Sequence, residues 1–252
     1  LYHFPEFTCV FFIQMSSFLF LSQNLLVLLL VYPIKSYNKT RTMKRILLNP
    51  VKKNYFEKLK DININDQAHF IGSWNIENNN LCNEIINFFE TNKQLHRPGQ
   101  SGLGINNKIK QTTDLNITPD NLKDEHHECI KKYIDELYKC FIDYKLQWPF
   151  LKNMVKDVDI GSFNIQKYSK GDHFSQVHTE RADLRTSNRL FAWMTYLDNV
   201  ENGGTTNFLH YGIKIKPEIG KTLIWPAEWT HAHSGEILNN GEKYIITGWM
   251  NF

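Results

Sequence analysis

The sequence predicts an α+β protein, mainly β, in which an N-terminal helical region supports a C-terminal jelly roll (a double-stranded β-helix). Apolar residues recur at helical spacing between residues 79 and 146, whereas short β-prone segments separated by turn residues follow from residue 157. We therefore expect an apolar N-terminal segment over residues 1–42, a helical support region over residues 43–156 and a jelly-roll core over residues 157–252.

The composition is that of an ordinary globular protein. With 252 residues, 42% hydrophobic and 22% charged, the chain can bury one sizeable core. A net charge of +3 without any basic run argues against a nucleic-acid partner. The four cysteines, Cys9, Cys82, Cys129 and Cys140, have no CxxC spacing, so we expect reduced thiols in the cytoplasm.

Residues 1–42 allow three interpretations. No charge occurs from Phe7 to Ile34, which is long enough to span a bilayer, and basic residues follow, which would leave the rest of the chain in the cytoplasm. Polar residues interrupt this stretch, however, and Met43 heads an ordinary translation start. We favour non-native upstream translation over a membrane anchor or a signal-type segment, and expect a membrane partner only if residues 1–42 are native.

Two helices are expected before the β-rich part. The first runs from Asn79 to Lys93, and residues 96–113, rich in glycine and proline, follow as a loop. The second begins near Pro119 and runs to Leu146, since a proline at position 149 disfavours a helical residue before it.

Short strands and turns make up the C-terminal part. The candidate strands are Ile160 to Tyr168, Leu190 to Leu197, Ile213 to Ile215, Thr222 to Trp225 and Tyr244 to Trp249. Asn202-Gly203-Gly204 and Asn239-Asn240-Gly241 are turn signals between them. Many short strands with turns indicate a sandwich or a closed double sheet.

His178, Glu180 and a later histidine form a candidate metal site. In an extended strand the first two share a face, and two imidazoles with one carboxylate are the facial triad of non-haem Fe(II). A lone H-x-E is weak and also suits an ordinary polar pair, but this one lies where a strand would end at the mouth of a jelly roll. His231 and His233 both qualify as the later ligand, because they share a face if the segment is extended.

Lys243 begins a strand pattern of period two. Lys243, Ile245, Thr247 and Trp249 would face one way, and a buried ammonium needs an anion. The alternative is a lysine at the strand end whose head reaches water. The sharper interpretation is an ion pair with the carboxylate of a co-substrate, assisted by the Thr247 hydroxyl.

Six motifs occur together in residues 164–252. They are Tyr168-x-x-Gly171, His178-x-Glu180, Tyr196-Leu197-Asp198-Asn199-Val200, Gly203-Gly204-Thr205-Thr206-Asn207-Phe208, Pro217-x-x-Gly220-Lys221-Thr222-Leu223-Ile224-Trp225-Pro226 and His233-x9-Lys243. With them, this region resembles the Fe(II)- and 2-oxoglutarate-dependent dioxygenases, in their prolyl 4-hydroxylase-like branch. The last spacing matches that branch only when counted from His233, which we therefore favour over His231.

The resemblance implies a role for each site residue. Iron would be bound by His178, Glu180 and His233, and 2-oxoglutarate by Tyr168, Tyr196, Lys243 and Thr247, with Lys243 on its distal carboxylate. The usual aspartate of the H-x-D motif is here Glu180, which still supplies an oxygen ligand.

The implied reaction hydroxylates a peptidyl or free amino-acid side chain, with peptidyl proline as the leading substrate. It uses Fe(2+), 2-oxoglutarate and O2, yields succinate and CO2, and is supported by ascorbate. Arg181, Arg185 and Arg189 would contact an anionic or peptide substrate, or serve structure alone. The alternatives are a cupin-like metal- or sugar-binding jelly roll and a hydrolytic zinc site, since two histidines and a glutamate also suit zinc.

Overall fold

The computed structural model describes residues 68–102 and 104–252. The expectations for residues 1–42, and for the start of the support region up to residue 67, lie outside these described residues. Within them, none of the helices has the length and the apolar character needed to cross a membrane.

The described residues form two antiparallel sheets and three α-helices. The larger sheet has the order β1-β11-β8-β13-β6-β4-β2, with β5 also paired to β13, and the smaller has the order β10-β9-β12-β7-β3. The strands of the larger sheet are β1 (Gly72–Asn75), β2 (Arg97–Pro98), β4 (Thr113–Ile117), β5 (Asp159–Ile160), β6 (Phe163–Ser169), β8 (Arg189–Tyr196), β11 (Lys221–Pro226) and β13 (Glu242–Asn251). Those of the smaller sheet are β3 (Lys110–Gln111), β7 (His173–His178), β9 (Thr206–Phe208), β10 (Ile213–Ile215) and β12 (His233–Gly235). The predicted mainly-β jelly roll with helical support is confirmed.

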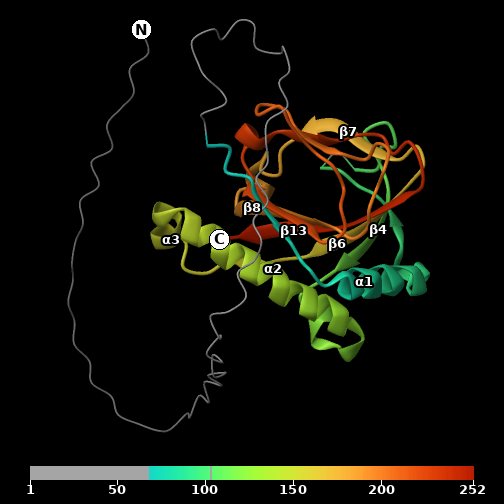
Figure 1. Cartoon of the computed structure of the whole chain (residues 1–252), viewed down its shortest axis with the longest axis horizontal. Helices are drawn as coiled ribbons and strands as arrows, with labels where there is room; N and C mark the ends of the chain where they lie inside the picture. The colour runs from blue at the N-terminus through green and yellow to red at the C-terminus, as the bar shows by residue number, and fades with distance from the viewer. Residues whose placement is uncertain (1–67, 103) are drawn as a thin grey trace, which may run out of the picture. The chain divides into compact units, whose positions relative to one another are not determined.

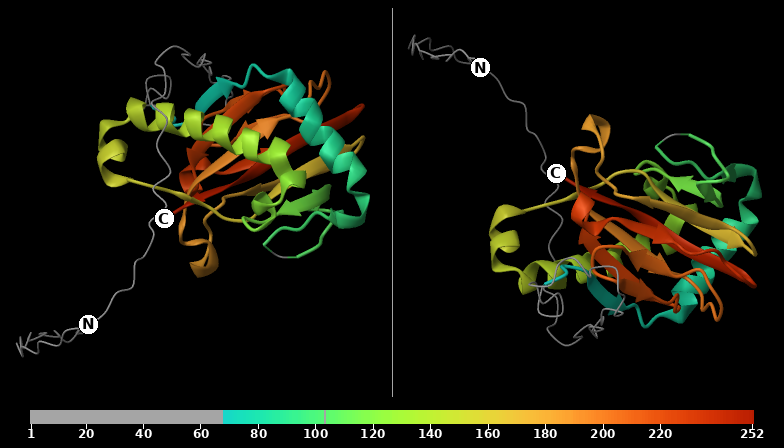
Figure 2. Two further views of the ribbon diagram at one scale, coloured as in Figure 1. Left: turned by 90° about the horizontal axis from the view of Figure 1, so that it is seen from below. Right: turned by 90° about the horizontal axis from the view of Figure 1, so that it is seen from above.

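The larger sheet is covered on both faces. Figure 1 shows the smaller sheet facing it on one side and the helices lying along the other, and Figure 2 shows α2 (Glu128–Gln147) crossing its strands. In β8, Phe191 and Trp193 belong to the core on the helix side, while Met194 and Tyr196 belong to the core between the sheets. Because side chains alternate along a strand, β8 supplies two different environments.

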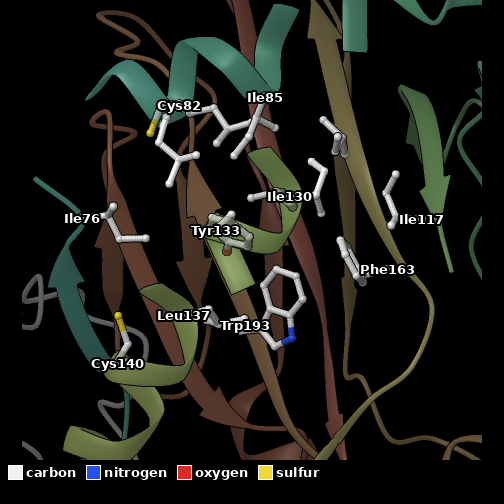
Figure 3. Close-up of a cluster of buried hydrophobic side chains, with 14 of the residues drawn as sticks. Ile76, Cys82, Ile85, Ile117, Ile130, Tyr133, Leu137, Cys140, Phe163 and Trp193 are labelled. Carbon is white, nitrogen blue, oxygen red and sulfur yellow. The ribbon is translucent and has the colours of Figure 1, made fainter. Parts of the chain in front are cut away.

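The helices pack on the sheet through one apolar face each. In α1 (Asn79–Thr91), the Asn78 side chain accepts a hydrogen bond from the Leu81 backbone N–H, capping the helix. The buried residues of α1 and α2 are Leu81, Cys82, Ile85, Phe88 and Phe89, and Ile130, Tyr133, Leu137, Cys140, Phe141 and Tyr144. Figure 3 shows Tyr133 and Leu137 beside Trp193 in this core.

A hydrogen-bond chain ties α2 to the sheet, and a glycine makes room for the Trp193 ring beneath the helix layer. The Tyr133 hydroxyl shares a hydrogen bond with Thr195 of β8, and Thr195 shares another with Thr222 of β11. Gly248 of β13 lies under the Trp193 ring, where a Cβ atom would come within 2.7 Å of that ring. The hydrogen bond positions α2 on β8, and the glycine lets the Trp193 ring pack closely on β13.

The second helix starts later than predicted. The structure has two short 3-10 turns, Asn121–Lys123 and Glu125–His127, before α2 begins at Glu128. Asp124 accepts a hydrogen bond from the His126 backbone N–H, so a polar side chain supports a local turn in competition with the α-helix. After Pro149 the chain forms another short helix, α3 (Pro149–Met154), with proline at its first position.

The support region also contributes strands. Residues 96–113, expected to be a loop, contain β2, β3 and the first residue of β4, and β1 lies before α1. All of these strands have only two to five residues. So short a strand is stabilised by its neighbours in the sheet and leaves little periodic pattern in the sequence.

Candidate metal centre and co-substrate pocket

Two adjacent strands of the smaller sheet bring the predicted triad together. His178 is the last residue of β7 and is paired in register with His233 of β12, and Glu180 follows just beyond the strand end. Glu180 Oε1 lies 3.7 Å from His178 Nε2 and 3.3 Å from His233 Nε2. The three ligand atoms lie within 4.8 Å of one another. The H-x-E thus stands at the mouth of the jelly roll, as predicted.

Backbone carbonyls orient both imidazoles. His178 Nδ1 lies 2.9 Å from the Gln176 carbonyl oxygen, and His233 Nδ1 lies 2.9 Å from that of His231. Since a carbonyl only accepts, each Nδ1 donates a hydrogen bond to its carbonyl, and each Nε2 is left facing the site. Burial, with the nearby His233 ring, lowers the pKa of His178 to about 4, so this imidazole is neutral at neutral pH.

The Glu180 carboxylate is ionised. Burial by itself raises its pKa, but the imidazoles of His233 and His178 and the indole N–H of Trp249 outweigh burial and bring the pKa to about 2. Trp249 Nε1 donates to Oε2 at 2.7 Å, while Oε1 faces the imidazoles. Oε2 of the carboxylate is thus hydrogen-bonded to Trp249, and Oε1 faces the two imidazoles, where a metal would bind.

This donor set fits a divalent transition metal. Ligand atoms at about 2.1 Å from an ion and at right angles to each other lie about 3 Å apart, close to the separations of Glu180 Oε1 from the two imidazoles. Two imidazoles and one carboxylate match the facial triad of non-haem Fe(II).

His231 is separated from this site. It ends the 3-10 helix Trp229–His231, so the expectation that His231 and His233 share a strand face is wrong. Its ring nitrogens lie at hydrogen-bond distance from Thr230 Oγ1 and from the His69 carbonyl oxygen. The 3-10 turn rotates His231 away, and its own carbonyl instead orients His233.

A cavity of about 730 Å³ leads from the triad into the space between the sheets. Lys243, Ile245, Thr247 and Trp249 of β13 all line it, as their period predicts. Trp225 also lines it, beside His233, and its buried indole N–H has no acceptor among the described residues. A buried donor without a partner is typical of a site that takes a ligand or water.

Lys243 stands at the inner end of this cavity. It is only 3% exposed, its Nζ donates to the Gly204 carbonyl at 3.0 Å, and it lies 3.8 Å from the centre of the Tyr168 ring. Gly203 and Gly204 have positive φ, which lets this predicted turn bring the carbonyl to the lysine. Burial lowers the pKa of Lys243 to about 8, opposed by Asp198 and Glu236. No carboxylate of the described residues lies within ion-pair distance of it.

The three predicted hydroxyl groups already have partners. The Tyr168 hydroxyl donates to Gln166 Oε1, and the Thr247 hydroxyl donates to the Trp193 carbonyl. The Tyr196 hydroxyl donates to Thr206 Oγ1 at 2.6 Å, and Thr206 rather than Tyr196 lines the cavity. Tyr196 would therefore reach a ligand in the cavity only through Thr206.

The three arginines after the H-x-E are all engaged by acidic residues. Arg181 pairs with Glu228 and Arg185 pairs with Asp183. Arg189 donates to the Glu180 carbonyl at 2.8 Å. Arg185 and Arg189 line the cavity, and Arg181 does not.

Sequence reasoning did not assign roles to two groups. Trp249 holds a triad carboxylate, and its inward position in the period of β13 was the available signal. The second group joins Lys110, Asp114 and Gln166: Lys110 Nζ and Gln166 Nε2 both donate to Asp114 Oδ2. No spacing signals this group, since β3, β4 and β6 meet only in the fold.

Comparison with known proteins agrees with this geometry. Residues 163–251 match the family model described as the 2OG-Fe(II) oxygenase superfamily. Over 115 residues the chain is 27% identical to probable prolyl 4-hydroxylase 9 of Arabidopsis thaliana, a match that covers 35% of this chain and 40% of the plant protein.

Solved structures show the same fold. A prolyl-4-hydroxylase of Pseudomonas putida aligns with a TM-score of 0.57 at 16% identity, covering 73% of this chain and 94% of that one. A prolyl hydroxylase of Trichoplax adhaerens, solved with a hypoxia inducible factor peptide fragment, aligns with a TM-score of 0.58 at 16% identity, covering 73% and 84%.

The fold is a jelly roll, and the triad is the ligand set of a non-haem iron site. Residues 163–251 match the 2OG-Fe(II) oxygenase superfamily, an enzyme family, and the structural neighbours are prolyl hydroxylases.

Proposed function

We propose that this protein is a hydroxylase that uses Fe(II), 2-oxoglutarate and O2 to hydroxylate a peptidyl or amino-acid side chain, with peptidyl proline as the first candidate. Succinate and CO2 are the co-products, and ascorbate supports turnover. The observation that carries the proposal is one cavity with a His2Glu triad at its mouth and a buried lysine inside. A peptide substrate is supported by the peptide-bound Trichoplax adhaerens neighbour.

His178, Glu180 and His233 would hold the iron, which when bound supplies oxidative decarboxylation of 2-oxoglutarate and transfer of one oxygen atom to the substrate. The protein's own contribution is to orient the ligand atoms. The Gln176 and His231 carbonyls hold both Nε2 atoms toward Glu180 Oε1. Phe174 stacks on His178 at 3.8 Å and limits the access of water to that imidazole.

Lys243 would pair with the distal carboxylate of 2-oxoglutarate. Lys243 is buried, and within residues 68–102 and 104–252 no carboxylate pairs with it, so an incoming anion is favourable because a desolvated ammonium is costly when unpaired. Tyr168 and Thr247 would shape this end of the pocket, and Tyr196 would act through Thr206. A cupin-like binder that lacks 2-oxoglutarate gives no reason to bury a lysine here.

The first test is the visible difference spectrum of the anaerobic Fe(II) protein on addition of 2-oxoglutarate. We expect a charge-transfer band that weakens in K243A and E180A. Iron-loaded, folded protein that gives no band would contradict the proposal and favour the cupin-like alternative.

The substrate is tested separately, by succinate release with proline-containing peptides, the same peptides carrying alanine for proline, and free amino acids. We expect release above the uncoupled rate, and a product heavier by one oxygen atom, with the proline peptides. Equal release with the alanine peptides would contradict the prolyl assignment while leaving the cofactor chemistry intact.

A further inference from the structure

The two oxygens of Glu180 have different neighbours. Oε1 lies 3.3 Å from His233 Nε2, whereas Oε2 accepts a hydrogen bond from Trp249 Nε1 at 2.7 Å. Glu180 follows the end of β7 of the smaller sheet, and Trp249 belongs to β13 of the larger one. A residue of the triad is therefore tied across the cavity to the opposite sheet.

Arg189 completes this contact. Its guanidinium carbon lies 3.5 Å from the centre of the Trp249 ring, its Nη1 donates to the Glu180 carbonyl at 2.8 Å, and the same Nη1 lies 3.8 Å from Oε2. Both the backbone and the outer oxygen of Glu180 are thereby held, and stacking on Arg189 fixes the indole that donates to Oε2.

Glutamate needs such a restraint more than aspartate does. It has one more rotatable bond, and its carboxylate can bind a metal through one oxygen or through both. Binding through both would occupy a position that a facial triad leaves open. An aspartate would place the carboxylate about 1.5 Å nearer its own backbone, too far from Trp249 to keep the 2.7 Å bond.

We propose that Trp249 and Arg189 are positioning residues that hold Oε2 of Glu180 away from the metal, so that Glu180 offers Oε1 alone. This rests on the proposed function and explains how the chain can use a glutamate as the carboxylate of the triad. The pair acts through Glu180 and need not contact the co-substrate.

The test compares W249F with wild type using Co(II), whose visible spectrum reports the number of ligands. Phenylalanine removes the N–H donor and keeps a ring for Arg189. We expect the Co(II) Kd to rise about 10–100-fold, as for loss of other groups that orient a ligand, with a changed spectrum and a retained fold. Wild-type affinity and spectrum in W249F would overturn the proposal.

W193F is the matched control. Trp193 is buried in the helix-side core, and its indole N–H has no partner among the described residues, so this variant loses ring volume without losing a bond to Glu180. It should lower the Tm and leave the Co(II) Kd and spectrum unchanged. A change in Co(II) binding equal to that of W249F would assign the effect to packing and overturn the positioning role.

A double-mutant cycle tests whether the effect passes through Glu180. In the E180D background the bond to Trp249 is already lost, so W249F should then raise the Co(II) Kd little further. The same fold-change in both backgrounds would overturn the proposal. Wild-type protein that binds neither Co(II) nor Fe(II) with 2-oxoglutarate would instead reject the proposed function itself.

Discussion

The two faces of the larger sheet differ although they are built from the same strands. In β13, Tyr244, Ile246 and Met250 pack in the core on the helix side, whereas Lys243, Thr247 and Trp249 line the cavity. The helix face is mostly apolar and closed, with the polar pair Thr195 and Thr222 satisfied internally. The cavity face carries a lysine with no carboxylate partner among the described residues, and an indole that donates a hydrogen bond to Glu180.

This difference separates stability from function within one strand. Burial of apolar area stabilises the helix face, so its residues can be exchanged for others of similar volume. On the cavity face the position of each polar atom matters, because a ligand must meet it. Substitutions at adjacent positions of β13 should therefore change either the free energy of unfolding or the ligand affinity, according to the face on which the residue lies.

The largest effect is expected at the mouth of the cavity. E180A removes the only anionic ligand of the triad and should raise the Mn(II) Kd by at least about 100-fold, the upper end for loss of a group that merely orients a ligand. Titration calorimetry measures the affinity, and thermal unfolding should show that the fold persists. An unchanged Mn(II) affinity in E180A would show that these three residues do not form the metal site.

The next effect lies on the helix face. I246A should lower the free energy of unfolding by about 2–5 kcal/mol, because Ile246 is fully buried and its truncation leaves a cavity. Urea unfolding measures it. The Mn(II) and 2-oxoglutarate Kd values should not change, and weaker binding of either would show that the two faces are coupled.

K243M tests the cavity face of β13, as I246A tests the helix face. Loss of the ammonium should weaken 2-oxoglutarate binding by about 2–3 kcal/mol, on the order of 100-fold in Kd. The Tm should stay the same or rise, because methionine needs no counter-ion. The exposed lysine variant K123M is the control and should leave both values unchanged; a fall in Tm for K243M would indicate a structural role for the lysine.

The smallest effect is the pH dependence of co-substrate binding. With a pKa of about 8, Lys243 is mostly cationic at pH 7 and mostly neutral at pH 9, so the affinity for 2-oxoglutarate should fall about tenfold between them. Titrations across this range measure it, and the K243M curve should be flat. A wild-type affinity that rises with pH would contradict the assignment.

The same pKa makes an opposite prediction for the free protein. The pKa is lowered from its ordinary 10.5, so between about pH 8 and 10.5 the unfolded chain binds more protons than the folded one. The contribution of Lys243 to stability is thus unfavourable below pH 8 and is relieved as the pH rises through that range. The Tm difference between K243M and wild type should shrink accordingly.

The features that could be predicted from the sequence are those set by the alternation of side chains along a strand or helix and by the residues that turns require. The inward set of β13, the glycine turn at Gly203 and Gly204, and the helix faces follow from local rules of spacing and φ, and the structure has them as expected. The start of α2 and the strands β1 to β4 were missed, because 3-10 turns and two-residue strands depend on neighbours distant in sequence. The order of the motifs indicated the triad, but not which atoms would face one another.

The sequence alone determined the residue types of the site, the alternation that turns them inward and the family that residues 163–251 resemble. The spacing to Lys243 favoured His233 over His231, and the structure gives the physical reason, since the 3-10 turn at Trp229–His231 rotates His231 away. Tertiary structure placed Trp249 and Arg189 on the outer oxygen of Glu180. Such contacts join strands of opposite sheets, and their geometry is set by how the sheets pack and not by any spacing along the chain.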